Sequence, residues 1–415
     1  MLIDFSVENF LSIKNEQTLS METGERLSKF KNENTFETNG EKLLKNILIV
    51  GPNGSGKSNL IHALKTLQSI IIATPDKATD KLPATTFLLD QESEDKPTVM
   101  EIRFIKNGKK IHYKLSFTKY KIVYESLEFS LTNTGKYTQY FLRENNDFKT
   151  VPKGLEILTT QTRENEPIVS SAQKLNDPIS IDLLEWFNYD LRISGTRDPE
   201  DYYKFLKDDG LKAQFIEFMQ AVDVNIVDVD VRQHSIEVPE RFRELMNQDS
   251  IIRNELYILY NKYDADGNLI GKEPIAMGMD SRGTNKIKDI ALSFLNSQVH
   301  ENNKVLVFDE FDDSLHFEIS SALIKLFNSV GNKNQIIVTT HELKLLDDKL
   351  RKDQIYFVEK DFQGETTLFS LFDFKDIDNK RSNFSYYTKY LQGKFGALPN
   401  VRCEEMIGAL HFNQE

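Results

Sequence analysis

Hydrophobic and polar residues alternate along several parts of this chain, which is the pattern of β-strands with one buried face. Two alternating runs within residues 99–118 flank Asn107-Gly108, a dipeptide that favours a two-residue hairpin turn. Similar runs occur at residues 2–7, 17–21, 121–131 and 137–143, with a turn expected at 133–135. We therefore predict an antiparallel β-meander in the first part of the chain.

Three short runs are apolar throughout and predict buried strands at residues 47–50, 305–308 and 335–340. Helical spacing follows the first run to about Ala73 and recurs at 286–295. Residues 24–40 are polar and are predicted to be a loop, and residues 74–97 keep no sustained period apart from a short apolar run at 87–89. The region between is predicted to hold broken helices at 158–191, a helix within 201–221, a strand at 222–230 and a hairpin turning at 264–267. Together these patterns predict an α/β fold.

The first apolar strand leads into a glycine-rich loop that matches G-x-x-x-x-G-K-[ST] at every fixed position. Glycines let backbone N–H groups turn toward phosphate oxygens, and the following helix start adds partial positive charge. We expect Lys57 to reach the β- and γ-phosphates of ATP and the Ser58 hydroxyl to bind Mg²⁺. The nucleotide-binding residues predicted here are Gly51, Pro52, Asn53, Gly54, Ser55, Gly56, Lys57, Ser58 and Asn59.

The second and third apolar strands end in residues suited to phosphate chemistry. Asp309 and Glu310 follow the second strand, where Asp309 would hold the Mg²⁺ shell and Glu310 would polarise the attacking water. His341 follows the third strand and can reach a γ-phosphate, whereas a simple strand-end histidine is the alternative. We predict that Lys57, Glu310 and His341 are catalytic.

Ser281 and Gly283 stand just before the predicted helix at 286–295. A serine at this place can cap the helix, and a serine with a glycine can also form a second anion-binding nest. This second nest lies one helix upstream of Asp309, so the helix can lead directly into the strand that ends at the acids. Both readings of Ser281 stay open.

Composition limits the class of protein. A net charge of −12 and a pI near 5.3 disfavour general coating of nucleic acid, although they are compatible with a local basic patch. The single cysteine, Cys403, excludes an intrachain disulfide framework and suits a reducing cytoplasm. Asp4 and Glu8 interrupt the apolar start, and no run of about eighteen apolar residues occurs, so we expect a cytoplasmic protein without membrane contact.

The motifs, taken in order, resemble the ABC-type ATPase heads of the RecF, SMC and OLD-nuclease group. The resemblance implies a P-loop NTPase fold with an antiparallel β-meander and a helical insertion. It also implies that Ser281 and Gly283 act in trans on the γ-phosphate of a second copy, so that ATP joins a head-to-tail dimer. By the same resemblance, Ser314-Leu315-His316 would cross between the two sites and His341 would be the switch histidine.

Two features separate this chain from that group. Its signature motif reads S-R-G-T where the group has L-S-G-G-Q, and only Gln91 is a candidate for the glutamine-loop residue. Heptads do not run over three or four turns, so no long coiled coil is expected.

Residues 353–360, 366–372 and 390–399, with the opening NFLSIKNEQTLSM, resemble small bacterial AAA/ABC-type ATPases of abortive-infection and phage-defence operons, the AbiLi-like and RloA-like proteins. Members of that family are usually encoded beside a second protein, often an RloB-like nuclease. No nuclease motif is convincing after Lys360, so nucleic acid would be contacted through the partner.

We expect three regions: an N-terminal ATPase lobe at 1–155, a mainly helical insertion at 156–255 and a C-terminal ATPase lobe at 256–415. The expected function is ATP-driven dimerisation and hydrolysis that regulate a partner effector in anti-phage defence. The alternatives are a RecF-like DNA-binding repair ATPase and a non-hydrolysing ATP-dependent scaffold.

Overall fold

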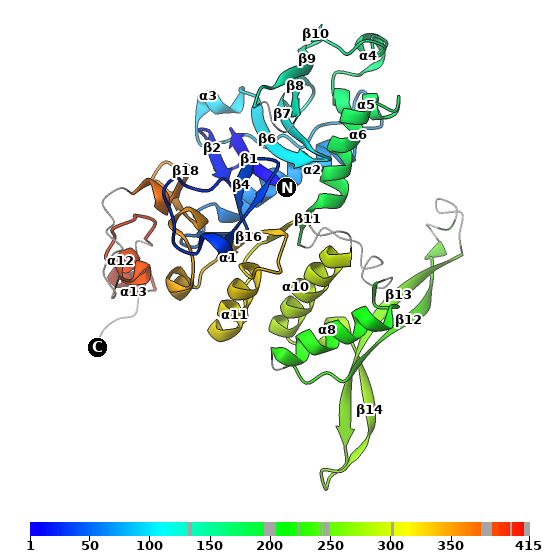
Figure 1. Ribbon diagram of the computed structural model, residues 1–415, viewed down its shortest axis with the longest axis vertical. Helices are drawn as coiled ribbons and strands as arrows, with labels where there is room; N and C mark the ends of the chain where they lie inside the picture. The colour runs from blue at the N-terminus through cyan, green and yellow to red at the C-terminus, as the bar shows by residue number, and fades with distance from the viewer. Residues whose placement is uncertain are drawn as a thin grey trace. The chain divides into compact units, whose positions relative to one another are not determined.

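The computed structural model describes residues 1–131, 135–194, 205–222, 224–240, 243, 249–299, 303–374, 384–398 and 401–410. The chain forms two compact units, each described by itself below (Figure 1). We call Leu2–Asn188 with Val338–Glu415 the discontinuous unit, and Met1 with Tyr189–Ile337 the inserted unit. The regions predicted at 1–155, 156–255 and 256–415 stay predictions.

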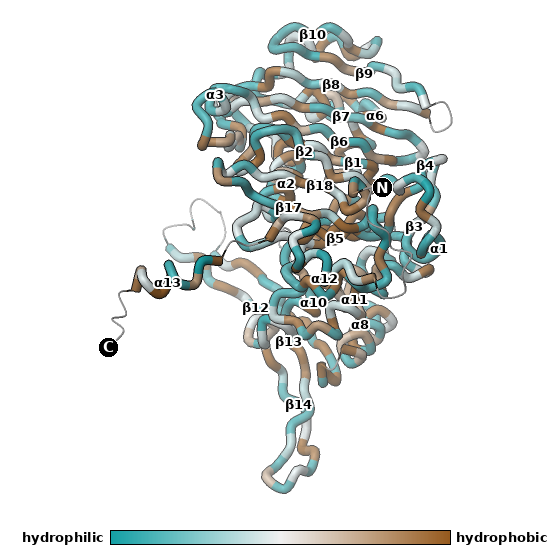
Figure 2. Tube along the Cα trace, turned by 90° about the vertical axis from the view of Figure 1, so that its left-hand side faces the viewer, coloured by the Kyte–Doolittle hydropathy of each residue, from teal (hydrophilic) through white to brown (hydrophobic). Residues whose placement is uncertain are grey.

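A seven-stranded antiparallel sheet in the discontinuous unit confirms the predicted meander. Its strand order is β10-β9-β8-β7-β6-β1-β2, and Figure 2 shows these strands side by side in that order. The predicted turn at 133–135 lies largely outside the described residues. The strands are β1 (Leu2–Glu8), β2 (Gln17–Ser20), β6 (Thr98–Lys106), β7 (Lys109–Phe117), β8 (Ile122–Leu131), β9 (Thr138–Glu144) and β10 (Asp147–Thr150).

One face of this sheet is largely apolar because alternate residues of its central strands are hydrophobic. On β6 these are Met100, Ile102 and Phe104, all fully buried. The helices of this face are α2 (Lys57–Ile72), α5 (Ile168–Gln173) and α6 (Pro178–Glu185), followed by a π-helical turn η1 (Trp186–Asp190). The Trp186 ring stacks on Phe104 with centroids 4.3 Å apart, which joins the end of α6 to the sheet.

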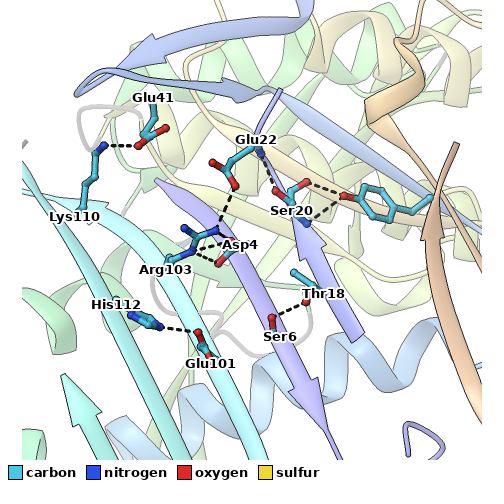
Figure 3. Close-up of polar contacts among 11 residues, drawn as sticks. Asp4, Ser6, Thr18, Ser20, Glu22, Glu41, Glu101, Arg103, Lys110 and His112 are labelled. Carbon is cyan, nitrogen blue, oxygen red and sulfur yellow. Dashed lines mark hydrogen bonds and ion pairs between the residues drawn. The ribbon is translucent and has the colours of Figure 1, made fainter. Parts of the chain in front are cut away.

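The other face of the sheet carries charged and hydroxyl side chains that pair across the strands (Figure 3). Arg103 on β6 lies between Asp4, whose two oxygens are both 2.9 Å from Nε, and Glu22, 3.3 Å from Nη2. His112 on β7 has Nε2 2.7 Å from Glu101 and Nδ1 3.2 Å from Glu128. These pairs specify which strands lie opposite one another.

The unfolding free energy should fall as pH rises through the pKa of His112. Burial opposes protonation of this imidazole, but hydrogen bonds to Glu101 and Glu128 and their charges outweigh burial and raise the pKa above 6.5. The stabilisation is therefore fully present below the unfolded-state pKa and is lost as pH rises through the folded-state pKa. Denaturant titrations between about pH 6 and pH 8 should show this loss, and His112→Gln should remove it. The exposed His62→Gln serves as control; equal pH dependence in all three proteins would contradict the assignment.

The strand before the glycine loop belongs to a second group of strands in the discontinuous unit. β5 (Asn46–Val50) pairs in parallel with β17 (Ile355–Lys360), which pairs antiparallel with β18 (Thr366–Ser370). β3 (Thr35–Thr38) pairs with β4 (Glu41–Leu44) in a hairpin, and β3 lies within residues 24–40, so the prediction of a loop there was wrong. The other short elements here are α1 (Lys31–Asn34), α3 (Gln91–Glu94), α4 (Leu158–Gln161), η3 (Leu343–Asp347), η4 (Lys352–Gln354), η5 (Leu371–Asp373), α12 (Tyr386–Leu391) and α13 (Cys403–Ala409).

In its described residues, the inserted unit contains a parallel strand pair, the helices α8 (Asp209–Ala221), α10 (Arg282–Val299) and α11 (Phe317–Phe327), and a separate antiparallel sheet. β11 (Leu191–Ile193) pairs with β15 (Val305–Phe308). β16 (Gln335–Thr340) starts in this unit and ends in the other. The separate sheet is β12 (Asp228–Glu237), β13 (Ser250–Tyr263) and β14 (Leu269–Ala276), joined to α10 by η2 (Met277–Met279).

We call β12–β14 the three-stranded arm. Leu256 and Ile258 of β13 are fully buried with apolar residues of α8 and α10, and the arm extends beyond both helices (Figure 1). The strand predicted at 222–230 begins only at Asp228. Val224 and Ile226 alternate because they pack against α8 in this hydrophobic core, so alternation here did not mark a strand.

Candidate functional site

The phosphate loop of the discontinuous unit connects the buried strand β5 to helix α2, as predicted. Gly54 and Gly56 have φ values of +74° and +107°, which L-residues with a side chain rarely adopt. A Cβ atom on Gly56 would lie 2.2 Å from Thr366 Oγ1, and one on Gly51 would lie 2.3 Å from the Val358 carbonyl oxygen. Glycine is therefore required both for the turn and for close packing against β17 and β18.

A series of side-chain hydrogen bonds supports the phosphate loop on the side of β18. The Thr366 hydroxyl donates to the Ser55 carbonyl at 2.8 Å, and the Asn59 amide donates to Ser12 Oγ at 2.6 Å. The Ser12 and Thr366 hydroxyls are 2.7 Å apart. Because Thr366 uses its proton on Ser55, Ser12 is the donor in that last bond. Asn59 was predicted from the sequence, but Ser12 and Thr366 were not, since nothing local marks them.

Lys57 is the first residue of α2 and is only 5% exposed. Its ammonium lies 2.7 Å from the Gly51 carbonyl oxygen, 3.0 Å from that of Pro52 and 3.5 Å from His341 Nδ1. An ammonium has only donors, so Nδ1 accepts in this contact and the imidazole proton is on Nε2. The structure thus brings together two predicted catalytic residues, Lys57 and His341, that are far apart in sequence.

A hydroxyl group of the loop that the described residues leave without a hydrogen-bond partner also fits a bound phosphate. Among the described residues, Ser55 Oγ is buried and has no hydrogen-bond partner. Leaving such a group unpaired costs about 1–3 kcal/mol, and a phosphate oxygen would satisfy it. Gly54 has nothing within 4 Å of its Cβ direction, so this side of the loop is open to a ligand.

The predicted acid pair lies in the inserted unit at the end of β15. Phe308 and Phe311 on either side of the pair are buried, with centroids 6.4 Å and 6.3 Å from the Phe327 ring. Glu310 has φ +46°, a strained backbone conformation for this residue. The two anchored phenylalanines thus force a tight turn that leaves the Glu310 side chain exposed and Asp309 partly exposed.

Ser281 and Gly283 lie at the start of α10. The Thr284 backbone N–H donates to Ser281 Oγ at 3.1 Å, so the predicted helix cap is confirmed. A Cβ on Gly283 would lie 2.5 Å from the Ser314 carbonyl oxygen, which places the signature motif directly against the Ser314-Leu315-His316 loop. Lys286 of the same helix donates to the Asp309 carbonyl at 2.8 Å. The action of Ser281 in trans stays a prediction.

The predicted site residues therefore fall into two groups. The discontinuous unit holds residues 51–59 with His341, and the inserted unit holds Ser281, Gly283, Asp309 and Glu310. Gln91 is the exposed first residue of the short helix α3 in the discontinuous unit. Across the described parts of the chain, no cluster of His, Cys, Asp and Glu could hold a metal ion, and no helix has the length and apolar character to cross a membrane. A Mg²⁺ site made from Ser58 and Asp309 therefore stays a prediction.

A glycine loop between a buried strand and a helix, with its lysine beside a strand-end histidine, defines a P-loop nucleotide-binding domain of ATPase type. The chain belongs to the AAA_21 family, described as "AAA domain, putative AbiEii toxin, Type IV TA system", whose profile matches residues 47–347. That span contains the phosphate loop, the signature motif, the acid pair and His341.

Solved structures of SMC heads are similar over most of the chain. An SMC head bound to the C-winged helix domain of ScpA is 15% identical, with a TM-score of 0.42, over 89% of this chain and 97% of that one. The SMC head domain from Thermotoga maritima is 15% identical, with a TM-score of 0.40, and the match covers 89% of this chain and 98% of that one. A third structure is an SMC head with an extended coiled coil, bound to the C-terminal domain of ScpA derived from Pyrococcus furiosus. It is 12% identical, with a TM-score of 0.45, and the match covers 89% of this chain and 96% of that one. Scores at this level do not assign a role to this chain, and no curated protein matches it.

Proposed function

We propose that this chain is an ATP-hydrolysing switch that dimerises on ATP and controls a partner effector in bacterial anti-phage defence. The observation that carries the proposal is the phosphate loop with its buried Lys57 ammonium against His341 at 3.5 Å. Membership in an AAA family supports nucleotide binding and ATPase activity. The same family description names a toxin of a toxin–antitoxin system, which favours a role in defence.

In the proposed reaction, backbone N–H groups of the phosphate loop and the Lys57 ammonium bind the β- and γ-phosphates. Glu310 accepts a proton from the attacking water as the γ-phosphate is transferred. His341 donates from Nε2 to a γ-phosphate oxygen and so responds to its presence. Mg²⁺, with Ser58 and Asp309 as the residues that would hold it, supplies charge neutralisation at the phosphates.

The signature motif would complete the site of a second copy. Ser281 is exposed at the N-terminus of α10, an eighteen-residue helix whose dipole favours an anion. In a head-to-tail dimer this serine and Gly283 would face the γ-phosphate held by the other chain. Hydrolysis would then release the dimer, and the lifetime of the closed state would set how long the effector is held or released.

The partner is proposed to be an effector encoded nearby, such as an RloB-like nuclease, that contacts nucleic acid itself. The net charge of −12 disfavours direct DNA binding by this chain. A salt-dependent DNA affinity of the isolated protein would favour the RecF-like alternative. ATP-dependent dimerisation without turnover would favour the scaffold.

Glu310→Gln should bind ATP but hydrolyse it about 10²–10⁴-fold more slowly, because the amide cannot accept the proton from water. The variant should therefore accumulate as a dimer in ATP, seen as a larger species by sedimentation. Asp313→Asn, in the same loop and also exposed, is the matched control and should behave as the parent. Hydrolysis by Glu310→Gln at the parental rate would remove Glu310 from the catalytic role.

A further inference from the structure

A lysine with no exposed side-chain surface lies in the first half of α10. Lys288 Nζ is 3.0 Å from Asp280 Oδ2 and 3.0 Å from the Met277 carbonyl oxygen. Burial lowers the Lys288 pKa, and the Asp280 carboxylate acts against this by favouring the charged form. A buried ion pair is weak support for stability compared with apolar packing, so its presence beside the signature motif calls for another explanation.

Asp280 is bound by residues of two elements, β13 and α10. The Tyr260 hydroxyl of β13 lies 3.1 Å and 3.2 Å from the two Asp280 carboxylate oxygens. The Asn285 amide of α10 donates to the Asp280 carbonyl at 3.0 Å. Burial, with the Asp280 charge, raises the pKa of Tyr260 to about 12, so the phenol keeps its proton and remains a donor. Asp280 is therefore fixed from the arm and from the helix at once.

The residue that follows Asp280 is Ser281. Asn285 bonds to both residues, because its side-chain amide donates to the Asp280 carbonyl and its backbone N–H donates to the Ser281 carbonyl at 3.0 Å. Ser281 itself is exposed, so packing does not orient it. The Ser281 hydroxyl is held by Thr284, and the polar contacts of Asp280 fix the backbone that leads into Ser281.

We infer that Tyr260, Asp280 and Lys288 are positioning residues that hold Ser281 in the geometry needed to meet the nucleotide of a second copy. They also connect the backbone next to that serine to β13 of the three-stranded arm. This inference rests on the proposed function, since it gives the three residues a role in a shared site. Its effect is therefore expected in the partner's site and not in the chain's own phosphate loop.

Tyr260→Phe tests the inference with the smallest change, removal of one hydroxyl. We expect kcat for ATP hydrolysis to fall about tenfold and ATP-dependent dimerisation to weaken, while the Kd for ATP stays unchanged. Tyr257→Phe is the matched control, because Tyr257 is on the same strand but its hydroxyl donates to Glu255, 2.9 Å away. Equal kcat values for Tyr260→Phe and the parent would overturn the inference.

Mixing Tyr260→Phe with Lys57→Ala distinguishes a positioning role of Tyr260 from a general effect of the substitution on the structure. The Lys57→Ala chain has an unaltered signature motif but a phosphate loop that does not work. In excess, it should pair with Tyr260→Phe chains and restore ATP hydrolysis at their phosphate loops to near the parental rate. Absence of rescue would overturn the inference, provided that Ser281→Arg is rescued by the same Lys57→Ala protein. If Ser281→Arg is not rescued either, the shared site itself is wrong and the inference falls with it.

Discussion

We expect that replacement of Lys57 by alanine lowers the affinity for ATP by more than about 100-fold, so that ATP binding is effectively abolished. The ammonium is buried at the loop, and hydrogen bonds to charged groups contribute about 1.5–3 kcal/mol each. Alanine is the best helix former, so α2 can still begin at this position. Equilibrium titration with ATP, together with circular dichroism of the variant, measures both parts of the prediction.

Lys65→Ala is the matched control for this experiment, since Lys65 is an exposed lysine further along the same helix. It should bind ATP as the parent does. A folded Lys57→Ala protein with parental affinity would show that the nucleotide site lies elsewhere.

Mixing Ser281→Arg with Lys57→Ala should restore ATPase activity that neither protein has alone. A mixed dimer has one composite site that carries both lesions and one that carries neither. The arginine should block closure on the partner's nucleotide while each Ser281→Arg loop still binds ATP. Turnover measured against the mixing ratio, in ATP, gives the result.

The alternative to action in trans is that Ser281 serves only as the N-cap of α10. If Ser281 only caps α10, its replacement should cost about 1 kcal/mol of stability and leave ATP hydrolysis unchanged. Ser281→Ala, which removes the cap without adding bulk, separates lost capping from blocked closure. No recovery of activity, with mixed dimers demonstrated, would contradict action in trans.

The local parts of the fold followed from the sequence because each depends on neighbouring residues. Alternation with Asn107-Gly108 predicted the β6–β7 hairpin, and the apolar run at 47–50 with its glycine motif predicted β5, the loop and α2. The hairpin β3–β4 was missed although Asn39-Gly40, both at positive φ, carries the same turn signal. Its strands are only four residues each, which is too short for a clear period.

Contacts between distant segments could not be predicted in this way. Ser12 and Thr366 are 354 residues apart, and serine and threonine are too common for their pairing behind the phosphate loop to be recognised. Lys288 lies within the predicted helix at 286–295, but its burial depends on the partner Asp280, which periodicity does not reveal. The left-handed turn at Glu310 likewise depends on how Phe308 and Phe311 pack.

The link between Thr366 and Ser55 affects how the protein is made. The two residues are 311 positions apart, so a ribosome adding about 5–20 residues per second needs roughly 15–60 s to reach the second after the first. Throughout that interval the nascent chain has a phosphate loop without its hydrogen bond to Thr366, and residues 189–337 are completed only toward the end of the interval. We therefore expect the phosphate loop to reach its final hydrogen bonding only after residue 366 has been made.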